Sequence, residues 1–246
     1  TVHSRVTWLR HVPEIARQNR TPSGIPCTTQ LLGSDADMMA KNALEAVRLG
    51  VQTIDLNFGC PAPTVNKHQG GAILLREPER IRQIVSTVRQ RLPENIPLTA
   101  KMRLGYEDGS RALECAQAIA QGGASTLAVH ARTKIEGYRP PAHWKQIAPI
   151  RQALNIPVIA NGDVFTLDDY LAIRQTSGCD DVMIGRGAQG QPWLFADIQH
   201  YLQHGTLPPP MPFQAASATI LRHLAAMHTF YGDNAGTRIA RKHIGW

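Results

Sequence analysis

The sequence lacks the features that place a protein in a membrane or outside the cell. Its 246 residues contain no run of about 18 uninterrupted apolar residues, so we expect no membrane-spanning helix. The first residues, 1–5, show no apolar stretch behind a basic start, which argues against a secretory signal. We therefore expect a cytoplasmic protein with no membrane partner.

Cysteine is also scarce, and its spacing excludes the usual structural roles. The four cysteines, Cys27, Cys60, Cys115 and Cys179, are far apart, and no pair has the spacing of a zinc site. A chain of this length buries a core without disulfide staples. We predict no disulfide and no metal site, so a cysteine with a special role would be a reactive one.

Acidic residues are in the minority. The chain has 26 Lys and Arg against 19 Asp and Glu, a net charge of +7 and a pI of about 9.5. A basic surface attracts polyanions such as nucleic acids, although many basic proteins bind none. The charge alone leaves a nucleic-acid partner open, and nothing in the sequence calls for an oligomer.

Short apolar runs alternate with helical stretches along the chain. The runs predict buried parallel strands, hydrophobic almost without alternation, at residues 25–32, 53–58, 98–104, 126–131, 157–160 and 181–184. Helical spacing of apolar residues predicts helices at 35–49, 78–91, 110–121 and 167–174. Strands that alternate with helices indicate an α/β fold with a parallel sheet and right-handed crossovers.

A (β/α)8 TIM-type barrel is favoured over an open sheet, because polar residues follow nearly every predicted strand and a barrel builds its site from that one end. These residues are Gln30, Asn57, Lys101, His130, Asn161 and Gly185–Arg186. A closed barrel needs eight strands, whereas the first 24 residues contain no clear strand and no initiator Met. We therefore expect that the first βα units are missing from this sequence.

The end of the chain differs in composition from the rest. Residues 207–212 are Leu-Pro-Pro-Pro-Met-Pro, which predicts an extended linker. Apolar spacing then predicts a helix at 213–231, a Gly-Asp-Asn turn and a basic second helix from residue 236 onward. We predict a catalytic barrel at 1–206, and at 207–246 the linker and the beginning of a small helical domain.

Cys60 is the strongest single candidate for chemistry. It follows a predicted strand, and a cysteine at the carboxyl end of a barrel strand points into the site. Its side chain serves as a nucleophile when it is a thiolate and as an acid when it is a thiol. A buried, inert cysteine is the alternative, because that is the commoner fate of free cysteines.

Two glycine-containing loops predict a phosphate site. Residues 161–163 (Asn-Gly-Asp) and 185–187 (Gly-Arg-Gly) follow the last two predicted strands, where barrels commonly bind phosphate. Glycine lets backbone N–H groups approach an anion, and arginine adds charge. Ordinary turns use the same residue types, but two such loops in this order favour a phosphorylated cofactor such as FMN.

Three further polar residues carry little weight singly. Lys101 at the barrel mouth would either hold negative charge on a reduced flavin or pair with a carboxylate. His130 would contact a phosphate or a cofactor ring, and Gln30 a flavin edge, but an ordinary polar role fits each of them equally well.

In combination, these residues resemble the motif series of the tRNA-dihydrouridine synthases. The motifs follow the family's order from Gln30 to about Pro192, at 57–61 (Asn-Phe-Gly-Cys-Pro), 70–72 (Gly-Gly-Ala), 101–103 (Lys-Met-Arg), 130–133 (His-Ala-Arg-Thr), 161–163 and 185–187. Segments 20–24 and 137–139 further resemble the bacterial C subfamily, which acts at position 16 of the D-loop. Segments 190–193 and 240–243 also resemble the B subfamily. The family's Ala-Pro-Met segment on its first strand is absent from this sequence.

The resemblance implies a specific reaction. Reduced FMN would give a hydride to C6 of a uridine in the tRNA D-loop, Cys60 would protonate C5, and NADPH would reduce the flavin again. Asn57 would hydrogen-bond the target uracil, and Tyr138 would lie near the base, which must leave its stack to reach the flavin.

The resemblance also implies how the cofactor and the RNA are held. Gln30 and Lys101 would hold the flavin ring. The ribityl-phosphate would be surrounded by His130, Asn161, Gly162, Asp163, Gly185 and Arg186. Candidates for contacts to tRNA phosphates are Arg132, Lys134, Arg139, Arg238, Arg241 and Lys242, and a solvated surface charge is the alternative for each.

Two other functions remain open from the sequence. One is an FMN-dependent barrel that reduces a free pyrimidine, as dihydroorotate dehydrogenases do, although a small substrate needs no basic appendage such as the one after the linker. The other is a truncated RNA-binding remnant without flavin, which would bind tRNA with a steep salt dependence.

Overall fold

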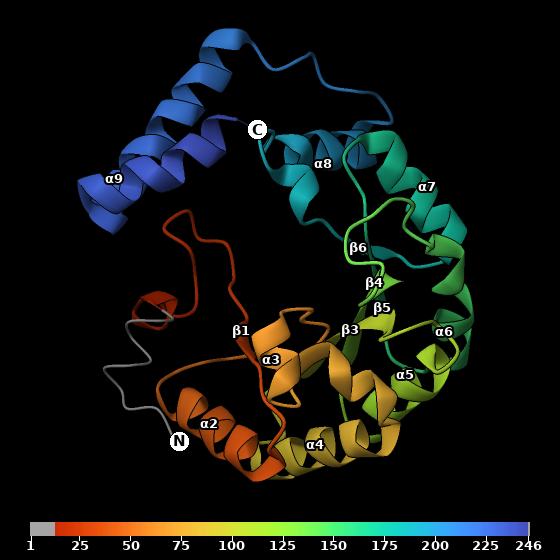
Figure 1. Ribbon diagram of the computed structural model, residues 1–246. Helices are drawn as coiled ribbons and strands as arrows, with labels where there is room; N and C mark the ends of the chain where they lie inside the picture. The colour runs from red at the N-terminus through yellow and green to blue at the C-terminus, as the bar shows by residue number, and fades with distance from the viewer. Residues whose placement is uncertain (1–12, 246) are drawn as a thin grey trace. The chain divides into compact units, whose positions relative to one another are not determined.

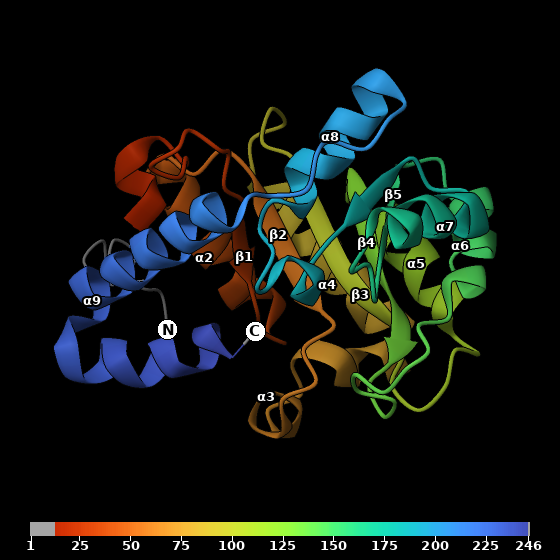
Figure 2. The ribbon, with the colours of Figure 1, turned by 90° about the horizontal axis from the view of Figure 1, so that it is seen from above.

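The computed structural model describes residues 13–245, and its first feature is a single parallel sheet (Figure 1). Six strands pair in chain order: β1 (Thr29–Leu31), β2 (Ile54–Phe58), β3 (Leu98–Gly105), β4 (Thr126–Thr133), β5 (Val158–Asn161) and β6 (Asp181–Met183). Figure 2 shows β1 to β5 following one another in this order. The predicted α/β fold with a parallel sheet is confirmed, and consecutive parallel strands joined by helices are the arrangement of a barrel segment.

Strand β1 is shorter than the predicted strand at 25–32. Pro26 forms an isolated antiparallel bridge with Arg20 instead, and Ile25 is 60% exposed. Proline has no N–H to donate to a neighbouring strand. The start of the apolar run therefore pairs back with Arg20 and does not extend the strand.

Helices follow the strands, most of them in the predicted positions. They are α2 (Ala36–Arg48), α3 (Pro63–Lys67), α4 (Pro78–Arg91), α5 (Ala112–Gln121), α6 (Ala148–Ala153), α7 (Leu167–Ser177), α8 (Leu194–His204) and α9 (Phe213–Ile244), with 3-10 helices η1 (Pro13–Arg17), η2 (Gly71–Arg76), η3 (Trp144–Gln146) and η4 (Arg186–Ala188). The Asp35 side chain accepts a hydrogen bond from Met38 N and so begins α2. Helices α3, α6 and α8 were not predicted, and α3 and α6 have only five or six residues, too few to show helical periodicity.

The strands alternate between an apolar and a polar face. On β2, Ile54, Leu56 and Phe58 are completely buried, whereas Asp55 and Asn57 between them are only partly buried. The prediction of strands without alternation is therefore wrong for β2, and β3 and β5 begin with the same alternation. The apolar residues form the core, and Figure 1 shows α2, α4, α5 and α6 along one side of the sheet. The polar face is free to build a site.

The described residues form two compact units. The first runs to Gly162 and includes Ile173–Met183, so it holds all six strands; the second consists of Asp163–Ala172 and the chain from Ile184 onward. The separate boundary predicted at residue 206 stays a prediction. No helix within residues 13–245 is both long enough and apolar enough to cross a bilayer.

The predicted turn in the last segment is confirmed. Residues 207–212 have no regular secondary structure, and Phe213–Ile244 is helical on both sides of Gly232, which has φ 75° and ψ 167°. This left-handed φ suits glycine and breaks the helix into two segments.

Candidate active site

The strand register brings most of the predicted site residues of the first unit onto the polar face. Gln30 is paired with Asp55, Asn57 with Lys101, and His130 with Asn161. Arg103 on β3 lies opposite His130. Side chains alternate between the two faces of a sheet, and the pairing aligns these positions on neighbouring strands, so their side chains leave the sheet on the same side.

A chain of hydrogen bonds joins three of these side chains and Thr99 of β3. Thr99 Oγ1 donates to Asp55 Oδ1 at 2.5 Å, and Gln30 Nε2 donates to Asp55 Oδ2 at 2.6 Å. Asn57 Nδ2 donates to Gln30 Oε1 at 2.7 Å, and Asn57 Oδ1 accepts from the N–H of Gly59 at 2.9 Å. The chain runs from Thr99 on β3 through Asp55 on β2 and Gln30 on β1 back to Asn57 on β2, and ends at the N–H of Gly59, the residue before Cys60.

Two charged groups of opposite sign lie within this cluster. The pKa of Lys101 is lowered to about 8, chiefly by burial and also by the charge of Arg103, while the charge of Asp55 opposes both effects. Burial raises the pKa of Asp55, against the hydrogen bonds from Thr99 and Gln30 and the charge of Lys101. Partial burial therefore makes both groups sensitive to a charged ligand at this face.

The loop that carries Cys60 is held through its own backbone. The carbonyl oxygen of Cys60 accepts from Asn66 Nδ2 at 2.9 Å and from the N–H of Ala72 at 3.0 Å. Gly71 has φ +68°, and a Cβ there would lie 2.7 Å from that same oxygen. The Gly-Gly-Ala motif at 70–72 is thus explained by its close approach to the cysteine backbone.

Arg103 connects the loop after β2 with the loop after β4. Its side chain is 2% exposed. Nε donates to Gly59 O at 2.9 Å, and Nη1 donates to Thr133 O at 3.0 Å and Gly137 O at 2.9 Å. The guanidinium carbon also lies 5.2 Å from the centre of the Tyr138 ring. One buried side chain therefore holds the backbone next to Cys60 on one loop and the backbone next to Tyr138 on the other.

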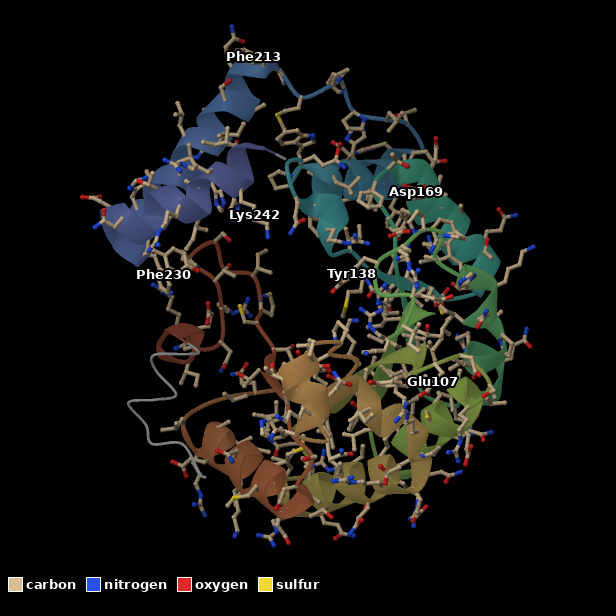
Figure 3. All side chains as sticks on the ribbon, in the orientation of Figure 1. Glu107, Tyr138, Asp169, Phe213, Phe230 and Lys242 are labelled. Carbon is tan, nitrogen blue, oxygen red and sulfur yellow. The ribbon has the colours of Figure 1, made fainter. Side chains whose placement is uncertain are left out.

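Tyr138 and His130 lie beside each other in the first unit. Tyr138 is 54% exposed, and Figure 3 labels it on the loop after β4. Its ring centre is 6.1 Å from that of His130, which is 6% exposed. Gly162 lies against the histidine, since a Cβ there would be 3.3 Å from His130 Cδ2, and the Gly162 carbonyl accepts from Trp144 Nε1 at 2.7 Å. Asn161, next to Gly162, donates from Nδ2 to Met183 O at 2.7 Å.

The structure corrects the expectation for Arg132. We predicted a tRNA phosphate contact, but this residue has no exposed surface and its Nε donates to Arg139 O at 2.7 Å. A completely buried guanidinium does not reach a polyanion at the surface. Arg132 instead supports the backbone of the loop that carries Tyr138.

The other basic candidates are accessible. Lys134 is partly buried with Nζ 4.7 Å from the centre of the Tyr106 ring, and Arg139 is exposed with Nη2 donating to Ile135 O at 3.1 Å. In the second unit, Arg238, Arg241 and Lys242 are all exposed on α9, where Figure 3 labels Lys242.

Residues from both predicted phosphate loops lie together in the second unit. Arg186 Nη2 lies 3.0 Å from Asp163 Oδ1, and Asp163 has φ +50°. Gly187 packs so closely on Val164 that a Cβ would overlap the valine carbonyl oxygen at 1.7 Å. Gly185 has open space around its Cα. The Asp163 carboxylate already partners Arg186, and a phosphate ligand would share that guanidinium.

Sequence reasoning assigned no role to Asp55, Thr99, Arg103 or Asn66. Asp55 and Asn57 are two residues apart on one strand, and this period-2 signal would have identified Asp55. Thr99 and Arg103 have the same spacing from Lys101 on β3 and would have been identified in the same way. Asn66 gave no such signal, because it lies outside the strands and contacts the Cys60 carbonyl oxygen.

Comparisons with known proteins identify the family. The model of the dihydrouridine synthase (Dus) family matches residues 2–246. A protein of Neisseria meningitidis serogroup B named tRNA-dihydrouridine(16) synthase is 69% identical over 205 residues, which are 83% of this chain and 62% of that protein. A protein of the same name from Ralstonia nicotianae is 56% identical over 193 residues, 78% of this chain and 59% of that one.

The chain thus spans about three fifths of the length of these curated relatives. Among solved structures, a mandelate racemase/muconate lactonizing family protein from Azoarcus sp. EbN1 has a TM-score of 0.51 at 20% identity, covering 74% of this chain and 42% of that one, a likeness of fold alone. The family match covers all but the first residue, and this chain therefore belongs to the dihydrouridine synthase family.

Proposed function

We propose that this protein reduces a uridine in the D-loop of tRNA to 5,6-dihydrouridine, at position 16, with FMN as cofactor and NADPH as reductant. The observation that carries the proposal is 69% identity to a tRNA-dihydrouridine(16) synthase over most of the chain. This similarity supports the bacterial C subfamily and position 16 in particular. The cytoplasm is the compartment we expect for such an enzyme.

The polar face supports a flavin by its chemistry. An FMN ring presents an edge of carbonyl oxygens and nitrogens, and the ring gains negative charge on reduction. Gln30 and Lys101 supply an amide and a partly buried ammonium group on one face of the sheet. We assign these two to the flavin ring, and His130 and Asn161 with Gly162 to the ribityl-phosphate.

We also assign three residues of the second unit to the ribityl-phosphate, as the sequence predicted. Arg186 pairs with Asp163, and Gly185 beside it has open space around its Cα, so the guanidinium and the glycine suit a phosphate group. When bound, FMN supplies the hydride that C6 of the uracil accepts.

The protein's own contribution is to position the base and to move one proton. Hydride addition at C6 leaves enolate character at C5, and this carbon must be protonated to complete the reaction. Cys60 donates that proton from Sγ, and the hydrogen bonds to its carbonyl oxygen keep the loop in place. Asn57 hydrogen-bonds the uracil and orients it beside the thiol.

Accessible basic residues support tRNA as the substrate. Lys134 and Arg139 follow β4 beside the half-exposed Tyr138, which offers a flat surface for a base that has left its stack. Arg238, Arg241 and Lys242 add positive charge on α9. We propose these five basic residues as contacts to tRNA phosphates.

The product distinguishes this function from its alternatives. The protein is incubated with FMN, NADPH and tRNA that lacks dihydrouridine, and the tRNA is then digested and analysed by mass spectrometry. We expect a gain of two hydrogen atoms at position 16. A gain at another position contradicts the C-subfamily assignment, and reduction of free orotate or uracil but not of tRNA contradicts tRNA as substrate.

A further inference from the structure

The proposed reaction gives no role to Asp55, although its carboxylate lies at the centre of the polar face. Both of its oxygens accept hydrogen bonds, one from Thr99 Oγ1 and the other from Gln30 Nε2. Asp55 is paired with Gln30 on β1 and with Thr99 on β3, so it connects three strands. It reaches Asn57 only through Gln30.

The hydrogen-bond chain begins at the Asp55 carboxylate and ends at the Gly59 N–H, and these two groups determine which atom donates in each bond between them. An ionised carboxylate only accepts, so the Gln30 amide turns its NH2 group toward Asp55 and its oxygen toward Asn57. At the other end the Gly59 peptide N–H only donates, so Asn57 turns its oxygen toward Gly59. Both ends require the same orientation of the two amides between them, so Gln30 and Asn57 each have one orientation in which these hydrogen bonds form.

This arrangement determines what Asn57 offers to a ligand. One Nδ2 hydrogen donates to Gln30, and the second has no partner among residues 13–245. An N–H group suits a pyrimidine carbonyl oxygen, whereas an amide turned the other way would oppose its oxygen to that carbonyl.

We infer that Asp55 is a positioning residue: through the Gln30 amide it fixes Asn57 so that Asn57 presents an N–H to the target base. The inference rests on the proposed function, which places the base at Asn57. Asp55 therefore acts by accepting a hydrogen bond, and its negative charge is of secondary importance.

A second account of Asp55 makes the opposite prediction. Lys101 lies nearby, and each group affects the titration of the other through its charge. If Asp55 acted as a counter-charge for Lys101, any neutral side chain would abolish its effect. If it acts as the acceptor for Gln30, a neutral side chain that still accepts would preserve most of it.

The test compares Asp55→Asn with Asp55→Leu. The amide at position 55 can turn its oxygen to Gln30 and its NH2 to the Thr99 hydroxyl, which accepts as well as donates. The leucine has the same branching at Cγ and no acceptor. Asp37→Asn is the matched control, because it removes the same charge from an exposed position on α2 that pairs with Arg91.

The first readout needs neither flavin nor tRNA. The side-chain NH2 signals of Gln30 and Asn57 are followed in 1H–15N spectra of the labelled protein and assigned by their loss in Gln30→Glu and Asn57→Asp. We expect wild-type positions in Asp37→Asn, near wild-type positions in Asp55→Asn, and shifted or broadened Asn57 signals in Asp55→Leu. Asn57 signals that are unchanged in Asp55→Leu, or equally perturbed in both variants at position 55, overturn the inference.

The second readout is turnover of tRNA at saturating FMN. We expect kcat/KM to fall by less than about threefold in Asp55→Asn and by more than about tenfold in Asp55→Leu, as for loss of one buried acceptor. In an Asn57→Ala background the Asp55→Leu change should have little further effect, because a residue that acts through Asn57 is not additive with it. Additive losses overturn the inference.

The two readouts separate the inference from the proposed function. If no variant and no wild-type protein turns over tRNA, the proposed function fails, and the NH2 spectra still decide whether Asp55 orients Asn57. Should Asp55→Leu not fold, the Asp55→Asn spectra decide alone, since perturbed Asn57 signals in that variant contradict the inference.

Discussion

The Arg103 guanidinium donates from Nε to the carbonyl oxygen of Gly59, 2.9 Å away, in the peptide unit that joins Gly59 to Cys60. The same guanidinium donates to Thr133 O and Gly137 O in the loop that carries Tyr138. Arg103 therefore couples the predicted acid on one loop with the predicted base-contacting tyrosine on another. One buried side chain therefore holds two loops that are far apart in the sequence.

Replacing Arg103 should be costly for stability. Arg103→Met keeps much of the volume but leaves three carbonyl oxygens without their donor, and we expect the free energy of unfolding to fall by about 3 kcal/mol. Denaturant titration measures the change. Arg82→Met is the control, because Arg82 pairs with Glu79 at the surface of α4 and its loss should leave unfolding nearly unchanged. Equal effects of the two substitutions would contradict a structural role for Arg103.

Two constraints favour glycine at position 71: its left-handed φ and its close approach to Cys60 O. Alanine substitutions at Gly71 and Gly178 separate them. Gly71→Ala places an L-residue at φ +68° and a Cβ 2.7 Å from Cys60 O, whereas Gly178→Ala meets a similar φ of +70° with open space around it. The left-handed conformation alone costs roughly 1–2 kcal/mol. We expect the Gly71 variant to lose clearly more stability than the Gly178 variant and to lose turnover as well. Equal losses would show that the contact with Cys60 is unimportant.

Lys101 should produce a rise of stability at alkaline pH in the flavin-free protein. Burial lowers its pKa in the folded state to about 8 from an ordinary value of 10.5. Between these values the unfolded chain binds the proton and the folded chain does not, so stability rises with pH across this window by up to about 1.4 kcal/mol per pH unit. Below pH 8 both states are protonated and the dependence disappears.

Unfolding measured from pH 7 to 10.5 in wild type and Lys101→Met isolates this effect. Other titrating groups cancel in the difference between the two proteins, so wild type should gain on the variant only above pH 8. Parallel curves over the whole range would contradict the lowered pKa of Lys101.

Cys60→Ala should separate binding from chemistry. The thiol is proposed only to protonate C5, so we expect flavin and tRNA to bind normally while turnover falls by about 100-fold or more, the usual contribution of a positioned acid. Cys27→Ala is the control, since Cys27 lies before β1 and has no part in the proposed reaction. Turnover in Cys60→Ala equal to that of the Cys27 variant would remove Cys60 from the mechanism.

Much of the fold follows from local sequence patterns. Asp35 begins α2, and Ile81, Ile84, Val85 and Val88 place α4 at the predicted residues, because caps and apolar spacing are readable without tertiary information. The strand at 25–32 was predicted too long, because its apolar character did not reveal that Pro26 pairs with Arg20.

The site was predictable where its residues follow strands and not where they contact distant backbone. Gln30, Asn57, Lys101 and His130 share one face because side chains alternate along each strand and the strand register aligns these positions. The burial of Arg132 could not be predicted from the sequence. Arg132 stands in the same motif as His130, and the motif does not distinguish a buried arginine from an exposed one. The position of Arg132 depends on how the 133–139 loop folds back to place Arg139 O beside it.

The reaction of the reduced flavin with its substrate tests the central claim most directly. The protein is loaded with FMN, reduced with NADPH in the absence of oxygen and mixed with tRNA that lacks dihydrouridine, and the flavin absorbance is followed. We predict rapid reoxidation by this tRNA and none by free uracil or orotate. A flavin that stays reduced with tRNA, or a protein that binds no flavin, would contradict the proposed function.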